Sequence, residues 1–132
     1  MKLQIDSVGE YNYVVKQQDL ASNWGNEVDV LATPILLWLA EIACMEAIKT
    51  QMDSDCMSLG LGHYNMKHQA PSLLNEKIRV HSKLIEINEN KLLFEVKAFD
   101  ESSQILSGMH ERAVVKKNIF LNKLAQKGKA LT

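Results

Sequence analysis

A single acidic residue lies in the middle of the most apolar segment of this 132-residue chain. The segment ATPILLWLAEIACMEAI, residues 32–48, surrounds Glu41 with leucine, isoleucine and alanine side chains. An unpaired carboxylate is costly to bury, so a carboxylate in such surroundings pairs, accepts hydrogen bonds or shifts its pKa. On a helix, Glu46 points about 140° away from Glu41 and lies nearer the end, where it reaches solvent. Glu41 is therefore a candidate base or nucleophile; the alternative is that it lies on the one wet stripe of the helix.

Two later segments hold basic side chains that could join Glu41 in a site. His68, in KHQAPS, comes at the end of an expected strand and before a turn, where side chains line clefts; the alternative is an ordinary surface histidine. In GMHERAVV, strand alternation places His110 and Arg112 on one face, which suits contact with an anion such as a phosphate. A solvated strand face is the alternative there. His63 and His81 lack such a context and are interpreted as surface histidines.

Thr33 admits two interpretations. It directly precedes Pro34, so it suits the N-cap of the helix, with the proline at the first helical position, where its missing N–H costs nothing. It could equally present a catalytic hydroxyl. Because a helix rises about 1.5 Å per residue, Thr33 and Glu41 lie about 12 Å apart along the axis. At that distance the two side chains do not touch, but both could face one elongated substrate.

The rest of the chain predicts a mainly antiparallel sheet. Strands are expected near residues 11–15, 56–71, 77–87, 91–100 and 104–117, with a loop at 22–26, turns at 88–90 and 100–103, and a short polar helix or tail at 118–132. Alternation in KLLFEVKAFD is regular, whereas in KIRVHSKLIEI it slips near Ser82, which indicates a bulge. A helix that is apolar all round must be enclosed. We therefore expect an α+β fold in which the sheet wraps around one long central helix, residues 34–48.

Composition excludes several classes of function. A formal net charge of −1 gives no footprint for nucleic acid. Cys44 and Cys56 form neither a CxxC pair nor a metal-ligand array, and the histidines lack metal-site spacing, so no metal or cofactor is expected. No apolar stretch suits a signal peptide or a membrane span, because Glu41 interrupts the longest one. The expectation is a single cytoplasmic domain, residues 1–132, that contacts no membrane.

Three segments together resemble a known family. VLATPILLWLAEIACMEA, HQAPS and GMHERAVV occur in the order and at spacings similar to those of hotdog-fold acyl-CoA thioesterases, in particular the branch of the fluoroacetyl-CoA thioesterases. The resemblance covers about residues 8–115. It implies a sheet wrapped around a central helix, and a homodimer joined edge to edge, with active sites near the subunit interface. Whether two such dimers form a tetramer is left open.

The resemblance also implies roles for particular residues. Thr33, Glu41 and His68 correspond to the threonine before the helix, the mid-helix carboxylate and the strand histidine, all catalytic. Arg112 corresponds to the substrate-binding arginine of the HER stretch. A glycine N–H helps to hold the thioester oxygen in that family; here Gly60 and Gly62 both lie nearby, and the choice between them stays open.

We therefore expect a thioester hydrolase that cleaves an acyl-CoA to the free acid and CoA. Glu41 would act as base or nucleophile, and His68 would assist. The segment NWGNEVDVLA carries Trp24, and Glu27 where the resemblance implies a lid aromatic, so an acyl group other than fluoroacetyl is expected. The alternatives are a non-catalytic acyl-CoA-binding module and, on the same fold, a hydratase or dehydratase of acyl thioesters.

Overall fold

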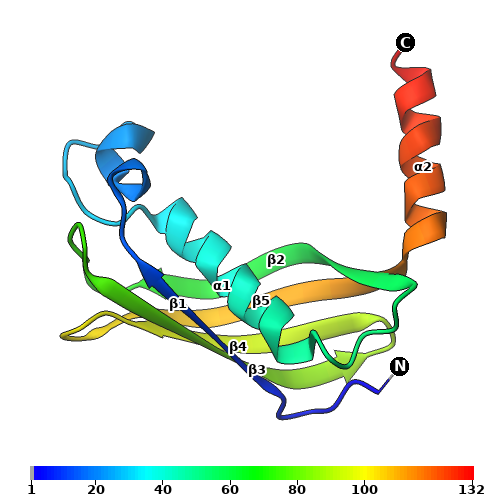
Figure 1. Ribbon diagram of the computed structural model, residues 1–132, viewed down its shortest axis with the longest axis horizontal. Helices are drawn as coiled ribbons and strands as arrows, with labels where there is room; N and C mark the ends of the chain where they lie inside the picture. Colours follow the sequence, from blue (N-terminus) through cyan, green and yellow to red (C-terminus); the bar gives the residue numbers. More distant parts are fainter. Residues whose placement is uncertain (1) are drawn as a thin grey trace.

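One antiparallel sheet carries a long helix, α1, across one face (Figure 1). The computed structural model describes residues 2–132. Its elements, in chain order, are β1 (Val8–Val14), two 3-10 turns (Gln17–Asp19 and Ala21–Trp24), α1 (Thr33–Ile48), β2 (Cys56–His68), β3 (Lys77–Asn88), β4 (Lys91–Phe99), β5 (Gln104–Lys116) and α2 (Lys117–Ala130). The prediction of an α+β fold with one long helix is confirmed.

The strands lie in the order β1-β3-β4-β5-β2, so β1 and β2 form the two edges. Short turns join β3 to β4 and β4 to β5, which therefore pair as neighbours along the chain. Strand β2 instead pairs with β5 at one edge, so the connection from β2 to β3 crosses the sheet. This pairing matters for the site, because it brings residues 56–68 alongside residues 104–116.

The core lies between α1 and the inner face of the sheet. The helix buries Leu36, Leu39, Ala40, Ala43, Cys44, Ala47 and Ile48. Strand β4 buries the four alternating side chains that the sequence predicted, namely Leu92, Phe94, Val96 and Ala98. The enclosure of the helix is only partial, however, because Trp38 is 50% exposed and Met45 is exposed beside it. Within one chain, the sheet covers one side of α1 and leaves an apolar stripe open.

Helix and sheet meet most closely at Gly9 and Ser82, which face each other across β1 and β3. The Ser82 hydroxyl is buried and donates a hydrogen bond of 2.7 Å to the carbonyl oxygen of Ala43. The prediction of a bulge in this strand is confirmed, although Ser82 itself continues the inward face and the register shift lies further along, between Leu84 and Glu86. A serine in an inward position looks like a break in an apolar alternation.

Replacing Gly9 with alanine is expected to lower the free energy of unfolding by about 1–3 kcal/mol, the usual cost of overpacking. A Cβ atom there would lie 2.5 Å from the backbone nitrogen of Ala47 and closer still to the carbonyl of Ala43, so helix and strand would have to separate. Urea unfolding measures the change. Gly128→Ala is the control, because open space surrounds that glycine in α2. Equal stability of G9A and the wild type would contradict this close approach.

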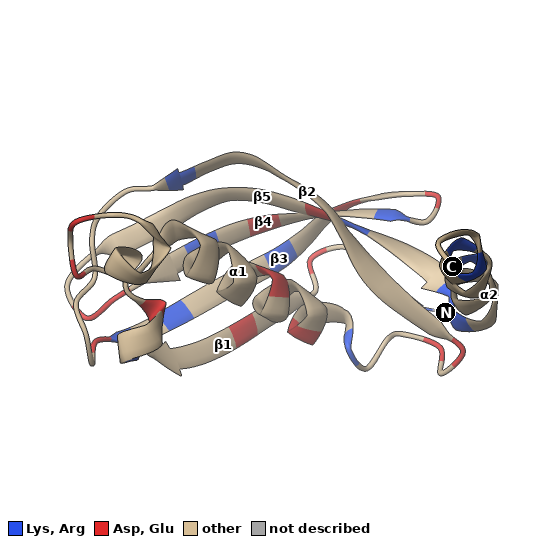
Figure 2. Ribbon diagram, turned by 90° about the horizontal axis from the view of Figure 1, so that it is seen from above, with Lys and Arg blue, Asp and Glu red and all other residues tan. Residues whose placement is uncertain are grey.

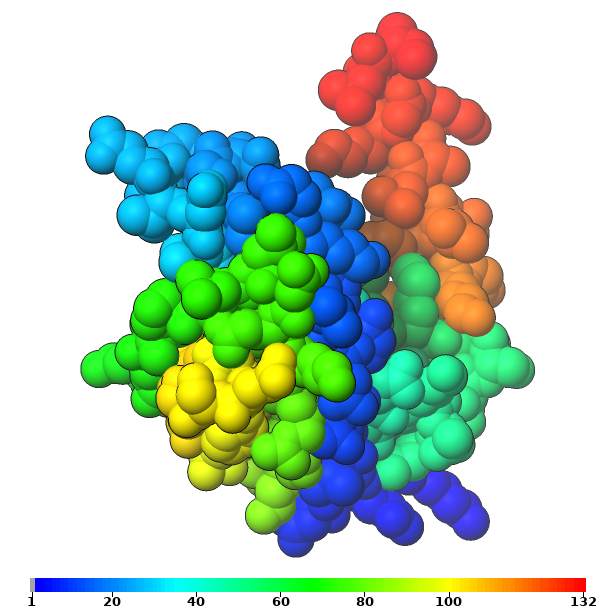
Figure 3. Space-filling model, turned by 60° about the vertical axis from the view of Figure 1, so that its left-hand side comes forward, coloured from blue at the N-terminus to red at the C-terminus, as the bar shows by residue number. Residues whose placement is uncertain are grey.

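Helix α2 projects away from the sheet and buries none of its residues (Figures 1 and 3). The expected polar helix at the end of the chain is thus present. It carries the basic residues Lys117, Lys123, Lys127 and Lys129. Figure 2 shows the helix end-on, with its basic positions in blue. Among residues 2–132, no helix is both long and apolar enough to cross a membrane.

Candidate active site

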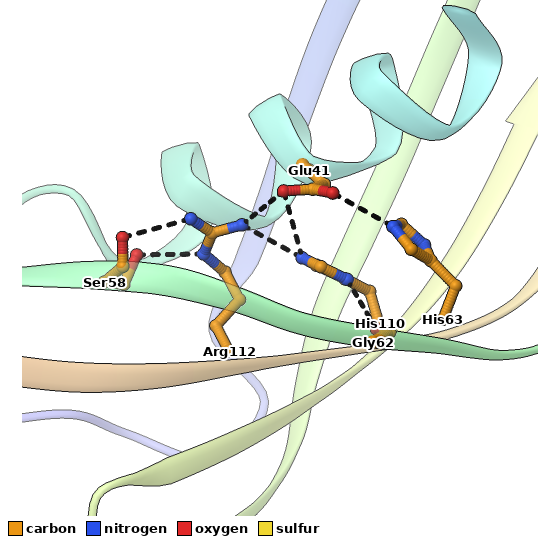
Figure 4. Close-up of polar contacts among 6 residues, drawn as sticks. All are labelled: Glu41, Ser58, Gly62, His63, His110 and Arg112. Atoms are coloured by element: carbon orange, nitrogen blue, oxygen red, sulfur yellow. Dashed lines mark hydrogen bonds and ion pairs between the residues drawn. The ribbon is translucent and has the colours of Figure 1, made fainter. Parts of the chain in front are cut away.

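Glu41 lies at the centre of a polar cluster between α1 and the β2–β5 pair (Figure 4). Its Oε1 accepts a hydrogen bond of 3.0 Å from Nη1 of Arg112, and its Oε2 lies 3.0 Å from Nε2 of His63. One third of the Glu41 side chain remains exposed. The carboxylate is therefore neither on a wet stripe nor unpaired: it is held from two sides and still open to a small molecule.

Arg112 anchors this cluster to the sheet. Its guanidinium is only 4% exposed, and it donates to the hydroxyl and the carbonyl of Ser58, at 2.9 and 3.1 Å, as well as to Glu41. The prediction that His110 and Arg112 share one inward face is confirmed by the burial of both. The anion that they face in this chain is Glu41.

The tautomer of His110 follows from its partners. Nδ1 lies 2.8 Å from the carbonyl oxygen of Gly62, which only accepts, so Nδ1 carries the proton. Nε2 is then an acceptor and takes a hydrogen bond of 3.0 Å from Nη1 of Arg112. Burial, with the neighbouring His63 and Arg112, lowers the pKa of His110 to about 4. The 3.8 Å approach of Nε2 to Glu41 is accordingly no ion pair, and Arg112 bridges the two groups.

His63 was wrongly interpreted as a surface histidine. Gly60 pairs with Arg112 and faces inward, so strict alternation would turn His63 outward. The register of β2 against β5 shifts between Gly60 and Gly62, and this bulge turns the His63 ring inward, opposite His110. The two rings stack with centroids 4.4 Å apart. A bulge reverses the direction of the following side chains and leaves no mark in the apolar and polar pattern of the sequence. The second glycine in SLGLG was the one sign of this bulge.

The electrostatics of Glu41 also differ from expectation. Weakened solvation alone would make the carboxylate more basic, and partial burial does push its pKa upward. The hydrogen bond from His63, the nearby His110 ring, and the hydrogen bond and charge of Arg112 outweigh burial, so the pKa of Glu41 lies below its usual value. Because His110 is neutral near pH 7, the guanidinium is the lasting positive charge. Glu41 is thus ionised but weakly basic.

Ligand atoms of Glu41, His63 and His110 lie within 4.8 Å of one another, close enough to hold a metal ion. The donor set resembles the two histidines and one carboxylate of many zinc sites. Arg112 argues against a metal here, because its Nη1 already donates to both Glu41 Oε1 and His110 Nε2. A divalent cation would have to displace a buried guanidinium of the same sign of charge.

Thr33 and His68 form a second pair, at the start of α1. The Thr33 hydroxyl lies 2.8 Å from Nδ1 of His68. The N-cap prediction for Thr33 was wrong: Ala32 is the N-cap, Thr33 is the first helical residue, and no side chain caps the helix. The extended conformation of Ala32 starts the helix one residue early, which frees the threonine hydroxyl for the histidine. Burial lowers the pKa of His68, so its ring is neutral near pH 7.

This pair lines an open groove of about 480 Å³. Its walls come from the 3-10 turn, the start of α1 and the loop after β2, and they are largely apolar. Trp24, at 56% exposure, lies on the wall, together with Val30, Pro34 and Ala70. The groove is wide enough for an organic acyl chain and has one hydroxyl–imidazole pair in its lining.

The predicted site residues therefore fall into two groups. Glu41, Arg112 and Gly60 lie together, since a Cβ on Gly60 would come within 2.8 Å of Glu41 Oε1. Thr33 and His68 lie about two helical turns away, in the groove, as the 12 Å estimate required. A Cβ on Gly62 would instead meet the Tyr64 side chain, so Gly60 is the glycine beside the carboxylate. An ionised carboxylate, two imidazoles and backbone N–H groups can together support addition of water to a carbonyl carbon.

Known proteins share both the sequence pattern and the fold. A family model described as fluoroacetyl-CoA-specific thioesterase matches residues 15–118. The fluoroacetyl-CoA thioesterase of Streptantibioticus cattleyicolor is 31% identical over 99 residues, which are 75% of this chain and 70% of that protein.

Solved structures add the fold. A structure of the fluoroacetyl-CoA thioesterase superposes with a TM-score of 0.87 and 25% identity, covering 96% of this chain and 98% of that one. A hot-dog-like protein from Thermanaerovibrio acidaminovorans superposes with a TM-score of 0.84 and 16% identity, over 93% of this chain and 91% of that one. The hotdog fold expected from the sequence is therefore confirmed.

Proposed function

Because this chain belongs to the fluoroacetyl-CoA-specific thioesterase family, and so is a thioester hydrolase, we propose that it cleaves an acyl-CoA to the free acid and CoA at Glu41. The observation that carries this proposal is the carboxylate itself. Glu41 is ionised, part-exposed and held by Arg112 and His63 in the interior of the protein. It drives attack on the thioester carbonyl, either as the nucleophile or by activating water.

Gly60 is proposed to stabilise the oxyanion that attack creates. A backbone N–H beside the reacting group lowers the barrier when it points at the developing negative charge. The missing side chain lets a substrate carbonyl approach, because any Cβ there would meet Glu41 and come within 3.5 Å of Arg112 Nη1. Arg112 serves the substrate mainly by orienting Glu41, since so little of its side chain is exposed.

Thr33 and His68 are proposed to act on the same substrate from the groove. An extended acyl-CoA is long enough to contact Glu41 and the groove together. The neutral His68 ring can exchange a proton with a bound group, and the Thr33 hydroxyl holds that ring in place.

Thr33→Val should lower kcat/KM at least about tenfold, the scale of one lost hydrogen bond, without loss of stability. The hydroxyl caps nothing, so the free energy of unfolding should change by less than about 0.5 kcal/mol. Thr33→Ser keeps the hydroxyl and should stay close to wild type. Assays of thiol release and urea unfolding on the three proteins test this. A stable, fully active T33V would remove Thr33 from the site, and a destabilised but active one would restore the N-cap interpretation.

The acyl group is proposed to be larger than fluoroacetyl. The groove of about 480 Å³ is open, mainly apolar and bordered by the exposed Trp24 ring. Glu27 is also exposed, and so offers no apolar cover to a small acyl group. Medium-chain and aromatic acyl-CoAs fit such a groove better than a two-carbon unit.

A homodimer is the proposed assembly, with residues 1–132 forming one hotdog domain in each protomer. The free edge of β2 favours an edge-to-edge partner, and the open apolar stripe of α1 around Trp38 and Met45 favours a further contact with it. Cytoplasmic location is part of the same proposal, since Cys44 and Cys56 are both free thiols. Release of free CoA thiol from acyl-CoAs by the purified protein tests the function itself.

A further inference from the structure

His63 is the only histidine of the Glu41 cluster that retains an unpartnered ring nitrogen among residues 2–132. Its Nε2 faces Glu41 Oε2 at 3.0 Å, and a carboxylate accepts, so Nε2 carries the proton of the neutral ring. Nδ1 then carries a lone pair and can only accept. It is buried, and no group in the described part of the chain donates a hydrogen bond to it. Buried polar atoms without partners are rare and call for an explanation such as a catalytic role or a bound water.

The other groups of the cluster are each committed to a partner. Both nitrogens of His110 are bonded, to Gly62 and Arg112, and its ring is fully buried. Both oxygens of Glu41 accept hydrogen bonds, one from a guanidinium. The His63 side chain, in contrast, is 21% exposed. Nδ1 itself is buried, so the water that uses this free acceptor is one held beside it inside the site.

We propose that Glu41 and His63 form a catalytic dyad, in which Glu41 orients the imidazole and Nδ1 of His63 takes the proton of the attacking water. This inference rests on the proposed thioesterase function and assigns to that reaction a base that the sequence did not reveal. A carboxylate behind an imidazole fixes the tautomer and stabilises the imidazolium that forms, the arrangement of many hydrolases.

The proton balance of the step is complete. As the water oxygen bonds to the thioester carbon, one water proton moves to Nδ1 and the carbonyl oxygen becomes an oxyanion. When the C–S bond breaks, the imidazolium returns that proton to the departing sulfur. The acid and the CoA thiol leave, and the ring is again neutral and bonded to Glu41.

The surroundings of His63 suit this role electrostatically. The charged and titratable groups that contact it are Glu41 from α1 and His110 from β5, and Arg112 donates to both of these. The hydrogen bond from His63, the nearby His110 ring and Arg112 together outweigh burial and lower the pKa of Glu41, which makes the carboxylate a poor proton acceptor near pH 7. The stacked His110 ring has its pKa lowered to about 4, so it stays neutral and does not repel an imidazolium on His63.

The test is His63→Gln, because the glutamine amide nitrogen occupies the place of Nε2 and keeps the hydrogen bond to Glu41 while removing the base. We expect kcat for thiol release from an acyl-CoA to fall about 10²-fold or more with KM little changed. His63→Ala should be equally slow, and imidazole added to the buffer should restore part of its rate. His81→Gln, on an exposed strand position, is the matched control and should equal the wild type.

Full activity of H63Q would overturn the dyad, because the hydrogen bond alone would then suffice. The dyad would also be overturned if H63A were slow and not rescued by imidazole while H63Q stayed active. Nitrogen-15 spectra of the wild-type histidines give a readout that needs no variant: Nε2 of His63 should be protonated and Nδ1 not, and the opposite tautomer contradicts the inference. Wild-type protein without thiol release on any acyl-CoA would overturn the proposed function as well, so the two failures are distinguishable.

Discussion

Glu41→Gln is expected to lower kcat for acyl-CoA hydrolysis by about 10²–10⁴-fold, the range that general-base catalysis contributes. Glutamine matches glutamate in shape and can still accept from Arg112 through its amide oxygen. It carries no negative charge, so it can neither attack the carbonyl nor stabilise an imidazolium on His63. The loss should appear in kcat rather than KM, because charge at Glu41 matters most in the transition state.

The control for this prediction is Glu46→Gln on the same helix. Glu46 is exposed and forms a 3.8 Å pair with the exposed Lys49, so E46Q should keep wild-type kcat. Steady-state thiol release at saturating acyl-CoA measures all three proteins. An E41Q enzyme that retains half of the wild-type rate or more would mean that the carboxylate has no chemical role.

Arg112→Gln is expected to lower the free energy of unfolding at pH 7 by about 2–4 kcal/mol. The shorter side chain leaves the Ser58 carbonyl and His110 Nε2 without donors, and it leaves Glu41 without its cation. The estimate stays below that of a fully buried ion pair because one third of the Glu41 side chain is in solvent. Urea unfolding gives the value directly.

The pH dependence of this effect has a defined sign. The pKa of Glu41 is lowered in the folded protein, so its ionisation stabilises the fold above the unfolded-state pKa. That stabilisation is lost as the pH falls through the folded-state pKa. The difference between wild type and R112Q should therefore shrink in acid, where protonated Glu41 no longer needs the guanidinium. Arg79→Gln, at an exposed position, is the control, and a difference that is the same at all pH values would contradict the account.

Residues whose chemistry conflicts with their surroundings were the ones that the sequence revealed best. Glu41 was conspicuous because an acid interrupts an apolar helix, and the structure gives it three basic neighbours: His63, His110 and Arg112. Strand β4 was equally clear, since its alternation is unbroken. Composition and periodicity thus identified the helix, the acidic residue within it, and the strand.

Residues whose position depends on a local irregularity were not predictable in this way. His63 faces inward only because β2 has one extra residue between Gly60 and Gly62, and a second shift between Tyr64 and Lys67 restores the original phase for His68. The alternation therefore holds at both ends of the strand and fails between them. Thr33 was misassigned for a similar reason. The helix begins one residue earlier than the sequence indicated, so Ala32 is the N-cap and the Thr33 hydroxyl bonds to His68.

The pairing of distant segments also lay beyond the sequence pattern. Arg112 reaches Ser58 because β2 lies beside β5 in the sheet and not beside β3, the next strand along the chain. Local periodicity gives the direction of a side chain but not the order of the strands. The resemblance to known thioesterases implied a sheet around a central helix, and the structure gives the strand order from which the interactions around Glu41 follow.

The measurement that tests the central claim most directly is free-thiol release from a panel of short, medium-chain and aromatic acyl-CoAs, run on the wild-type protein beside E41Q. The account predicts turnover by the wild type on at least one class, fastest with acyl groups larger than fluoroacetyl, and its collapse in E41Q. Tight acyl-CoA binding with no thiol release from any member of the panel would contradict it and identify a binding module instead.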